Sequence, residues 1–332
     1  MLSPAELLMN WLPDGVVQSS MLIIAGIFFL GIGGTLIVPA TTALGKVFKV
    51  SPVLIAILVI AGGTSAPELV VSVQAAFVGS PDIAIGNVIG SNMANMLLVT
   101  ALAGLMTAFP LHFASHQANS DDANKAKQDL LVMVVLTIII SLSLMLLAGI
   151  PAIISLSLLL ITGYYIYRLI SRDSDEQDII DEGQTPALWP AIGKVVGALL
   201  ALLAGADMIV SGGVLIATDL GLSQSAIGLS IVAVGTSLPE IVAVIASAFH
   251  KRSDLALGNI IGSNIFNLGI ILGLTGLIAP LPKSADITSL TIGCFALTTL
   301  IFTALILLKI TLKRPIAFVF VGFYFAFLNL QI

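Results

Sequence analysis

Long apolar stretches separated by short polar ones run along the whole chain. A helix that crosses a membrane needs about 20 mostly apolar residues. Segments of this kind predict ten spanning helices, at roughly 18–45, 52–78, 83–109, 129–149, 151–170, 189–217, 224–249, 254–279, 286–310 and 313–330. The two longest polar interruptions, 111–128 and 171–185, are predicted to be loops. The pattern therefore predicts an all-α membrane protein with ten transmembrane helices.

Composition agrees with a membrane location. Of the 332 residues, 58% are hydrophobic and 9% are charged, and the mean hydropathy is +1.12. An average soluble domain is about 45–50% apolar and about 25% charged. The lipid bilayer is thus the expected partner, and no nucleic-acid partner is expected. The lone Cys294 lies in an apolar run and can form neither an intrachain disulfide nor a CxxC metal site.

Positive charges favour one side of the predicted helices. If the N-terminus is outside, the loops that follow odd-numbered helices are cytoplasmic, and only Lys283 lies on the opposite side. This bias predicts an even number of spans in the cytoplasmic (inner) membrane, with both termini on the extracytoplasmic side. The residues that adjoin the cytoplasmic loops are Lys46, Lys49, Lys125, Lys127, Arg168, Arg172, Lys194, Lys251, Arg252, Lys309, Lys313 and Arg314.

The chain contains an internal repeat. Residues 61–99 align with residues 233–271 without a gap, at an offset of 172, and 18 of the 39 aligned positions are identical. Each copy covers the second and third helices of a five-helix half. Because each half has an odd number of helices, the second half is expected to insert upside down, with the substrate site between the repeats near the midplane. We predict an N-terminal repeat at 1–170, an acidic cytoplasmic linker at 171–188 and a C-terminal repeat at 189–332.

Two carboxylates, Glu68 and Glu240, lie deep in apolar helices at matching positions of the repeats. A charge at the centre of a bilayer costs at least about 2.5–3.5 kcal/mol, so intramembrane carboxylates are rare and usually functional. The plain structural alternative is a protonated glutamate hydrogen-bonded to a neighbouring helix. The matched pair favours ion binding over this alternative.

Each glutamate ends a Gly-Thr-Ser-x-Pro-Glu motif, at 63–68 and at 235–240. Proline removes a backbone donor and clashes with the carbonyl four residues before it, and glycine loosens the same turn, so the helix should kink. Carbonyl groups freed in this way persist in lipid only where they line a cavity or bind something. Because Thr64 and Glu68 are four residues apart, we expect them to share a helix face.

A second motif, Gly-Asn-x-Ile-Gly-Ser-Asn-x-x-Asn, follows at 86–95 and at 258–267. Its serine and last asparagine are one helical turn apart, at Ser91 and Asn95 and at Ser263 and Asn267. The glycines allow helices to approach closely, and the asparagines can serve simply to join helices. All these candidate ligands are oxygen atoms with no His or Cys nearby, which suits Ca²⁺ and argues against zinc, copper or iron.

Two carboxylates supply a charge that one Ca²⁺ neutralises, and sodium ions can occupy the same oxygens in its place. Carrying one or the other, without leaving two bare carboxylates in a low-dielectric path, gives coupled exchange.

The paired motifs resemble those of the calcium/cation antiporter superfamily, in its sodium/calcium exchanger branch of the bacterial or archaeal type. The resemblance covers about 80 residues at motif level and the whole chain in its ten-helix plan. It implies helices 2, 3, 7 and 8 around the ion site, and first and sixth helices that slide across this core, here the runs around Gly31, Gly33 and Gly34 and around Gly205, Gly212 and Gly213. The implied Ca²⁺ and Na⁺ ligands are Glu68, Glu240, Thr64, Thr236, Ser65, Ser237, Ser91, Ser263, Asn95, Asn267 and carbonyl groups at Ala61 and Ala233.

The chain departs from the potassium-dependent members of this superfamily, which carry Asp where Asn267 stands. With one carboxylate fewer, we predict that exchange needs no potassium. A Ca²⁺/H⁺ antiporter that uses the same carboxylates is the main alternative. A channel fits less well, because one internal pseudo-symmetric centre suits alternating access. No catalytic motif of an intramembrane enzyme is present; no cofactor is expected, and a monomer should suffice for transport.

Overall fold

The computed structural model describes residues 3–9, 15–107, 109–111, 120–174, 186–221, 233–283 and 287–329. Within these ranges the regular structure is helical apart from four strands of two residues each. The first half of the chain contains α1 (Pro4–Met9), α2 (Val16–Phe48), α3 (Pro52–Ile55), η1 (Ala56–Ile60), α4 (Ala61–Thr64), α5 (Ala66–Phe77), α6 (Pro81–Met93), η2 (Ala94–Val99), α7 (Thr100–Met106), β1 (Phe109–Pro110), α8 (Ser120–Leu146), β2 (Gly149–Ile150) and α9 (Ala152–Ser174).

The second half repeats this order of elements where it is described. It contains α10 (Leu188–Asp219), α12 (Ala233–Thr236), α13 (Leu238–Phe249), α14 (Ser253–Ile265), η5 (Phe266–Ile271), α15 (Leu272–Ile278), β3 (Leu281–Pro282), α16 (Ser289–Leu307), β4 (Thr311–Leu312) and α17 (Arg314–Asn329). The segments labelled η are π-helical turns that continue into the α-helices beside them.

Seven continuous helices in the described residues are long and apolar enough to cross a membrane. An eighth is the bent pair Pro52–Thr64 and Ala66–Phe77, whose two parts meet at 45°. Leu238–Phe249 and Arg314–Asn329 are apolar but shorter, and residues 224–232 of the predicted seventh span lie outside the described residues. The chain is thus an all-helical, multi-pass membrane protein.

One predicted helix start was wrong. Helix α8 begins at Ser120, nine residues before the predicted start, so half of the expected loop at 111–128 is helical. The predicted linker at 171–188 begins inside α9, which runs to Ser174, and ends on the first residue of α10. Residues 175–185 of this linker lie outside the described residues.

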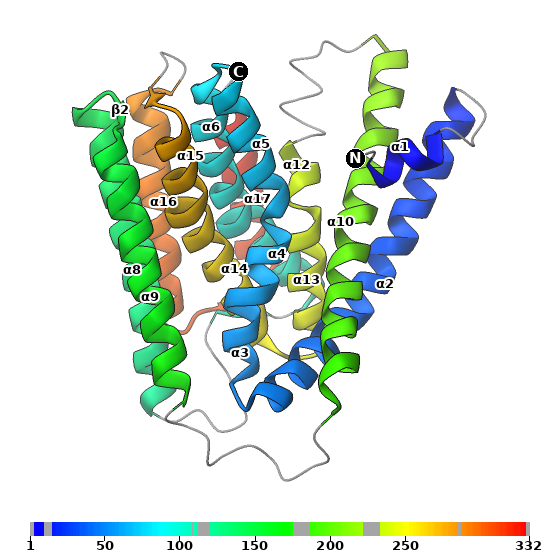
Figure 1. Ribbon diagram of the computed structural model, residues 1–332, viewed down its shortest axis with the longest axis horizontal. Helices are drawn as coiled ribbons and strands as arrows, with labels where there is room; N and C mark the ends of the chain where they lie inside the picture. The colour runs from blue at the N-terminus through cyan, green and yellow to red at the C-terminus, as the bar shows by residue number, and fades with distance from the viewer. Residues whose placement is uncertain are drawn as a thin grey trace.

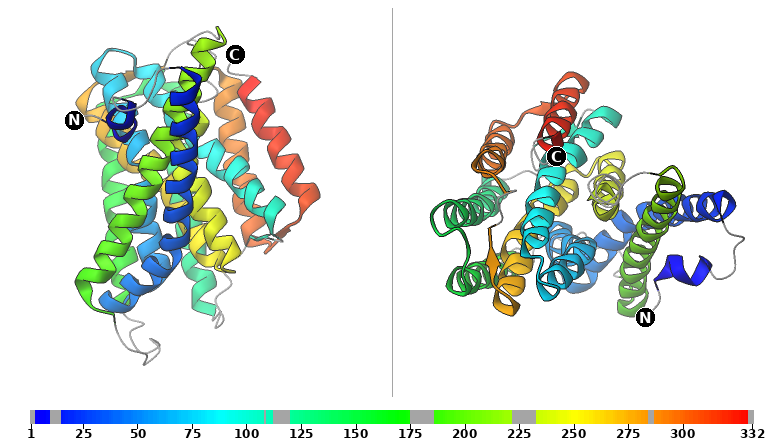
Figure 2. Two further views of the ribbon diagram at one scale, coloured as in Figure 1. Left: turned by 90° about the vertical axis from the view of Figure 1, so that its right-hand side faces the viewer. Right: turned by 90° about the horizontal axis from the view of Figure 1, so that it is seen from above.

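The helices form two groups (Figure 1). Helices α2 and α10 pack against each other along their length and lie at one edge of the molecule, with α1 beside them (Figure 2). The segments α6–η2–α7 and α14–η5–α15 are buried over most of their length. By contrast, α2, α9, α10, α16 and α17 expose large apolar side chains such as Phe28, Tyr167 and Phe323. This apolar outer surface is what a bilayer covers.

Two small antiparallel sheets join the halves of the chain. Phe109 and Pro110 of β1 pair with Leu312 and Thr311 of β4. Gly149 and Ile150 of β2 pair with Pro282 and Leu281 of β3. In each sheet, one strand comes from residues before the polar linker and the other from residues after it.

The two repeat copies share the same breaks. In each copy, a short helix stops at a serine before the proline, and a new helix starts at the next residue: α4, Ser65 and α5 in the first copy, α12, Ser237 and α13 in the second. The π-helical turns η2 and η5 begin at Ala94 and Phe266, which are equivalent at the offset of 172. Such turns inside α-helices are frequent at functional sites.

Candidate ion-binding site

The glutamates of the two repeats meet in the centre of the molecule. Glu68 is 1% exposed and Glu240 is 2% exposed, and the two carboxylates are close enough to repel each other when both are ionised. Each lies in the first turn of a helix, α5 or α13, where the helix dipole favours a negative charge. Among the described residues, no third Asp, Glu, His or Cys gathers with them into a cluster that could hold a metal ion.

Hydroxyl groups reach across the repeats to these carboxylates. The Ser65 hydroxyl donates to Oε1 of Glu240 at 3.2 Å, and the Thr64 hydroxyl also faces Glu240. In the opposite direction, the Thr236 hydroxyl faces Glu68, which the Ser91 hydroxyl approaches from α6. Each carboxylate therefore faces at least one hydroxyl group of the copy that does not contain it, and Glu68 also faces Ser91 of its own copy.

Thr64 and Glu68, which the sequence places on one helix face, lie on either side of a bend in the helix. The bend is at Ser65, whose backbone angles (φ −82°, ψ 8°) are not helical. The Thr64 hydroxyl is within 3.3 Å of the Ala61 carbonyl, to which it can donate. The same hydroxyl faces Glu240 of the other copy.

Four asparagines form a second set of hydrogen bonds between the copies. Nδ2 of Asn267 donates to Oδ1 of Asn92 at 2.9 Å, and Nδ2 of Asn95 donates to Oδ1 of Asn264 at 3.5 Å. These two bonds are equivalent under the offset of 172. Nδ2 of Asn92 also approaches the backbone carbonyl of Asn264 at 3.4 Å. Asn92 and Asn264 were absent from the predicted ligand set, although their position three residues before Asn95 and Asn267 could have indicated that they orient those residues.

Most of the predicted ligand set is buried, and Thr236 is partly buried. Ser91 and Ser263 lie in α6 and α14, Asn95 and Asn267 lie in the π-helical turns, and all four are at most 5% exposed. Ala61 is fully buried at the start of α4, and Ala233 starts α12. Six oxygens at these positions have no hydrogen-bond partner among the described residues: Oε2 of Glu68 and Glu240, Oδ1 of Asn95 and Asn267, and Oγ of Ser237 and Ser263.

Buried polar atoms are rarely left without a partner. A set of unpartnered carboxylate, amide and hydroxyl oxygens is chemically suited to a hard cation, because Ca²⁺ takes six to eight oxygen ligands in flexible geometry.

Asp207, another acidic residue in an apolar helix, is engaged elsewhere. Its carboxylate accepts a hydrogen bond of 2.8 Å from the backbone N–H of Ala5 in α1. Ser3 and Glu6 close the same helix end reciprocally, because each backbone N–H donates to the side chain of the other residue. Asp207 therefore fixes α1 on α10.

A multi-pass helical fold with a buried, oxygen-lined carboxylate pair at its centre is suited to a membrane protein that transports cations. The chain belongs to the sodium/calcium exchanger protein family, whose family model matches residues 19–171 and 191–332. The resemblance noted in the sequence is confirmed, and the family places the chain among transporters. Helix α1 and the polar linker lie outside the matched residues.

Known proteins agree with this assignment. The chain is 33% identical to CaxA, a proposed antiporter of Alkalimonas amylolytica, over 80% of this chain and 82% of CaxA. It is 29% identical to the sodium/calcium exchanger MaX1 of Methanosarcina acetivorans, over 94% of this chain and 98% of MaX1. Its fold is similar to that of the sodium-calcium exchanger NCX_Mj soaked with Na⁺ and Ca²⁺, with a TM-score of 0.78 and 25% identity over 94% of this chain and 98% of NCX_Mj.

Proposed function

We propose that this protein exchanges Ca²⁺ for Na⁺ by alternating access, with Glu68 and Glu240 as the shared ligands. The observation that carries the proposal is the buried pair of carboxylates, each of which keeps one oxygen without a hydrogen-bond partner among the described residues. One Ca²⁺ neutralises the two charges. Sodium ions bound to the same oxygens do so as well, whereas two bare carboxylates in a dry path are costly.

The ligands are proposed to divide between the two ions. Glu68 and Glu240 with the main-chain oxygens of Thr64 and Thr236 bind Ca²⁺, and Asn95 and Asn267 complete this centre. The Na⁺ ligands are Ser65, Ser91, Ser237, Ser263 and carbonyl groups near Ala61 and Ala233. Support comes from the burial of most of these groups and from the hydroxyls that each copy directs at the carboxylate of the other.

We propose ten spans arranged as two inverted five-helix repeats, at 1–170 and 189–332, with kinks in helices 2, 3, 7 and 8. The strand pairing supports this topology. The β1–β4 sheet joins the connections after the third and ninth spans, and the β2–β3 sheet joins those after the fourth and eighth. In a chain that crosses the membrane at each span, connections after two odd-numbered spans lie on the same side, and so do connections after two even-numbered spans. Two strands that pair in a sheet must also lie on the same side, so both sheets agree with this topology.

The distribution of charge then puts both termini on the extracytoplasmic side of the cytoplasmic membrane. In Figure 1 the C-terminal end of α17 and strand β2 lie at the same end of the molecule, and the turn between α2 and α3 lies at the other. A monomer contains both repeats and so is proposed to suffice for transport.

Helices α2 and α10 are the proposed sliding pair. They approach so closely that a Cβ atom on Gly26 would lie 2.7 Å from the Gly205 carbonyl oxygen, and one on Gly205 would lie 2.8 Å from that of Gly26. Gly33 and Gly212 contact the opposite helix in the same way. Gly31, which was grouped with them in the sequence, faces open space among the described residues. This packing favours movement of α2 and α10 as one body.

The experiment is isotopic calcium flux into proteoliposomes loaded with sodium, for the wild type, Glu240→Gln and Asp207→Asn. We expect Glu240→Gln to abolish exchange in a protein that still folds. Asp207→Asn is the matched control, since it also neutralises an acid in an apolar helix but one that holds α1, and it should retain exchange. Normal exchange by Glu240→Gln would refute the proposal.

Two finer statements have their own tests. Since Asn occupies position 95 and position 267, exchange should proceed without potassium, and transport that stops in potassium-free buffer would contradict this. Coupling to sodium rather than protons predicts calcium uptake under a sodium gradient with pH clamped by buffer and ionophore. Uptake that follows only an imposed pH gradient would instead indicate a Ca²⁺/H⁺ antiporter.

A further inference from the structure

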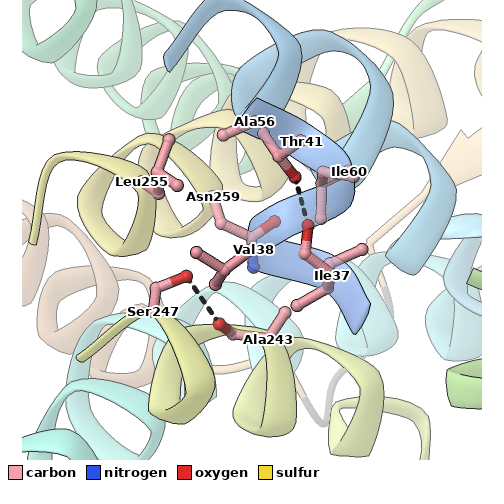
Figure 3. Close-up of a pocket in the computed structure, with 9 residues that line it drawn as sticks. All are labelled: Ile37, Val38, Thr41, Ala56, Ile60, Ala243, Ser247, Leu255 and Asn259. Atoms are coloured by element: carbon pink, nitrogen blue, oxygen red, sulfur yellow. Dashed lines mark hydrogen bonds between the residues drawn. The ribbon is translucent and has the colours of Figure 1, made fainter. Parts of the chain in front are cut away.

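A small cavity lies beside the ion site, between α2, η1, α13 and α14 (Figure 3). Its volume is about 10 Å³, close to the least space in which one water molecule fits. Most of its wall is apolar, but three polar side chains line it: Thr41 from α2, Ser247 from α13 and Asn259 from α14.

Asn259 is the unusual member of this wall. Its side chain is 2% exposed, and neither Oδ1 nor Nδ2 has a hydrogen-bond partner among the described residues. A buried amide without partners is costly, and polar groups in this situation commonly bind an ordered water molecule.

The two hydroxyls around Asn259 can accept but not donate. Thr41 donates its proton to the Ile37 carbonyl at 2.6 Å, and Ser247 donates to the Ala243 carbonyl at 2.8 Å (Figure 3). Their remaining lone pairs are the groups that a ligand in the cavity can use.

The hydrogen-bonding groups that line the cavity determine which kind of ligand it can bind. Nδ2 of Asn259 needs an acceptor, while Oδ1 of Asn259 and the two hydroxyl oxygens need donors. A cation can satisfy the oxygens but not Nδ2, and the described wall has no carboxylate to balance its charge. We propose that the cavity binds one water molecule, which accepts from Asn259 and donates to two of the three oxygens. This water joins Asn259 of α14 to α2, to α13 or to both.

The other repeat explains why the water is needed here. Asn87, equivalent to Asn259, donates to the Ser72 hydroxyl at 2.9 Å and to the Glu68 backbone carbonyl at 3.1 Å. The residue equivalent to Ser72 is Val244, whose side chain offers no hydrogen-bonding group. In the second copy, water therefore takes the place of a side chain. The inference does not depend on which ions the protein exchanges.

The test compares structures of the wild type, Val244→Ser and Val244→Ala, determined at a resolution that shows ordered water. In the wild type we expect a water at about 2.7–3.2 Å from Asn259 and from Thr41 or Ser247. Val244→Ser should supply the missing hydroxyl, turn the Asn259 amide toward it and release the water. Val244→Ala removes the same bulk without adding a hydroxyl, so the water should remain.

Three results would overturn the proposal. The first is a wild-type structure in which Asn259 bonds directly to protein and no water is present. The second is loss of the water from both variants, which would mean that bulk at position 244 controls the cavity. The third is an anomalous signal in the cavity after soaking with thallium or strontium ions, which would identify the ligand as a cation.

Discussion

The two repeat copies, residues 61–99 and 233–271, have identical residues where they bond to each other and differ at several positions whose bonds lie within one copy. The carboxylates, their hydroxyl partners and the asparagines on the facing side are identical in both copies. Outside this centre, Ser72 in the first copy is replaced by Val244 in the second, and Gly79 is replaced by Lys251. Ser65, Asn95 and Asn267 each bond to a residue of the other copy, so a change in one copy would leave a partner in the other unsatisfied.

This pattern of contacts makes each copy depend on the other. Ser65 binds Glu240 and Asn267 binds Asn92, so a buried group in one copy is satisfied by the other. Residues that bond within one copy are free of this constraint. The first copy joins Asn87 to Ser72, and the second copy has no equivalent bond. The comparison separates residues that form the common centre from residues that adjust one side of it.

The largest expected effect comes from breaking the carboxylate pair from either side. Glu68→Gln and Glu240→Gln should reduce sodium-driven calcium uptake by a similar factor. Loss of one partner from a buried charged site costs about 3–5 kcal/mol, which corresponds to about 100-fold or more in affinity. The measurement is isotopic calcium uptake over a range of calcium concentrations. A variant that keeps near-normal uptake while the other is inactive would mean that the two copies do not share one ion equally.

A smaller effect should distinguish the two asparagine bonds. Asn92→Leu leaves Nδ2 of Asn267 without its acceptor at 2.9 Å, whereas Asn264→Leu removes two longer bonds, one of 3.5 Å from Asn95 and one of 3.8 Å to Sδ of Met133. We expect Asn92→Leu to lower the free energy of unfolding by about 1–2 kcal/mol, and Asn264→Leu by less, because hydrogen bonds between membrane helices are worth about this much. Reversible unfolding in mixed micelles measures both.

Double-mutant cycles give the control for this pair. The coupling of Asn92→Leu with Asn267→Leu should exceed that of Asn264→Leu with Asn95→Leu. Equal couplings would show that the difference between the two bonds has no energetic consequence.

The sequence alone was sufficient to locate most helices and to identify the central residues. Hydropathy locates apolar helices because a bilayer requires continuous apolar length, and the internal repeat draws attention to Glu68 and Glu240. What could not be predicted is which copy each side chain serves. Thr64 was expected to share a helix face with Glu68, and helical spacing gives no sign that its hydroxyl faces Glu240 of the other copy.

Contacts between distant segments were also beyond the sequence. The link from Ala5 to Asp207 joins residues 202 positions apart, and nothing in either local pattern indicates it. In the same way, Asn87 and Asn259 occupy identical motifs. Their different hydrogen bonding follows from position 72 or 244 on another helix, which the motif does not include.

A third prediction concerns Ser72 and Val244, the equivalent positions at which the two copies differ. Ser72→Val should remove the 2.9 Å bond to Asn87 and lower the free energy of unfolding by about 1 kcal/mol. Adding Val244→Ser to the same protein gives the second copy the bond that the first has lost, so we expect the double variant to recover part of the loss. Thermal unfolding of the single and double variants in detergent measures this. Ser72→Ala is the control for shape, and a loss confined to Ser72→Val would assign the effect to the branched side chain instead of the hydroxyl.

The smallest expected effect concerns the turn that ends α5 and α13. The turn is the same in both copies: Ser80 N–H bonds to the Ala75 carbonyl at 2.8 Å, and Arg252 N–H bonds to the Ser247 carbonyl at 2.9 Å. Its left-handed position is Gly79 (φ 78°) in the first copy and Lys251 (φ 57°) in the second. The second copy therefore carries a side chain in a conformation that favours glycine.

Replacing this residue tests the backbone alone, since a Cβ on Gly79 would meet nothing within 4 Å among the described residues. Gly79→Ala should destabilise the protein by about 1 kcal/mol, because the left-handed conformation costs an L-residue about 1–2 kcal/mol. Lys251→Gly should stabilise it by less than this, because glycine loses more conformational freedom on folding. Lys251→Ala keeps the backbone cost but removes the charge. If it stabilises the protein as much as Lys251→Gly does, then the charge rather than the backbone distinguishes the two turns.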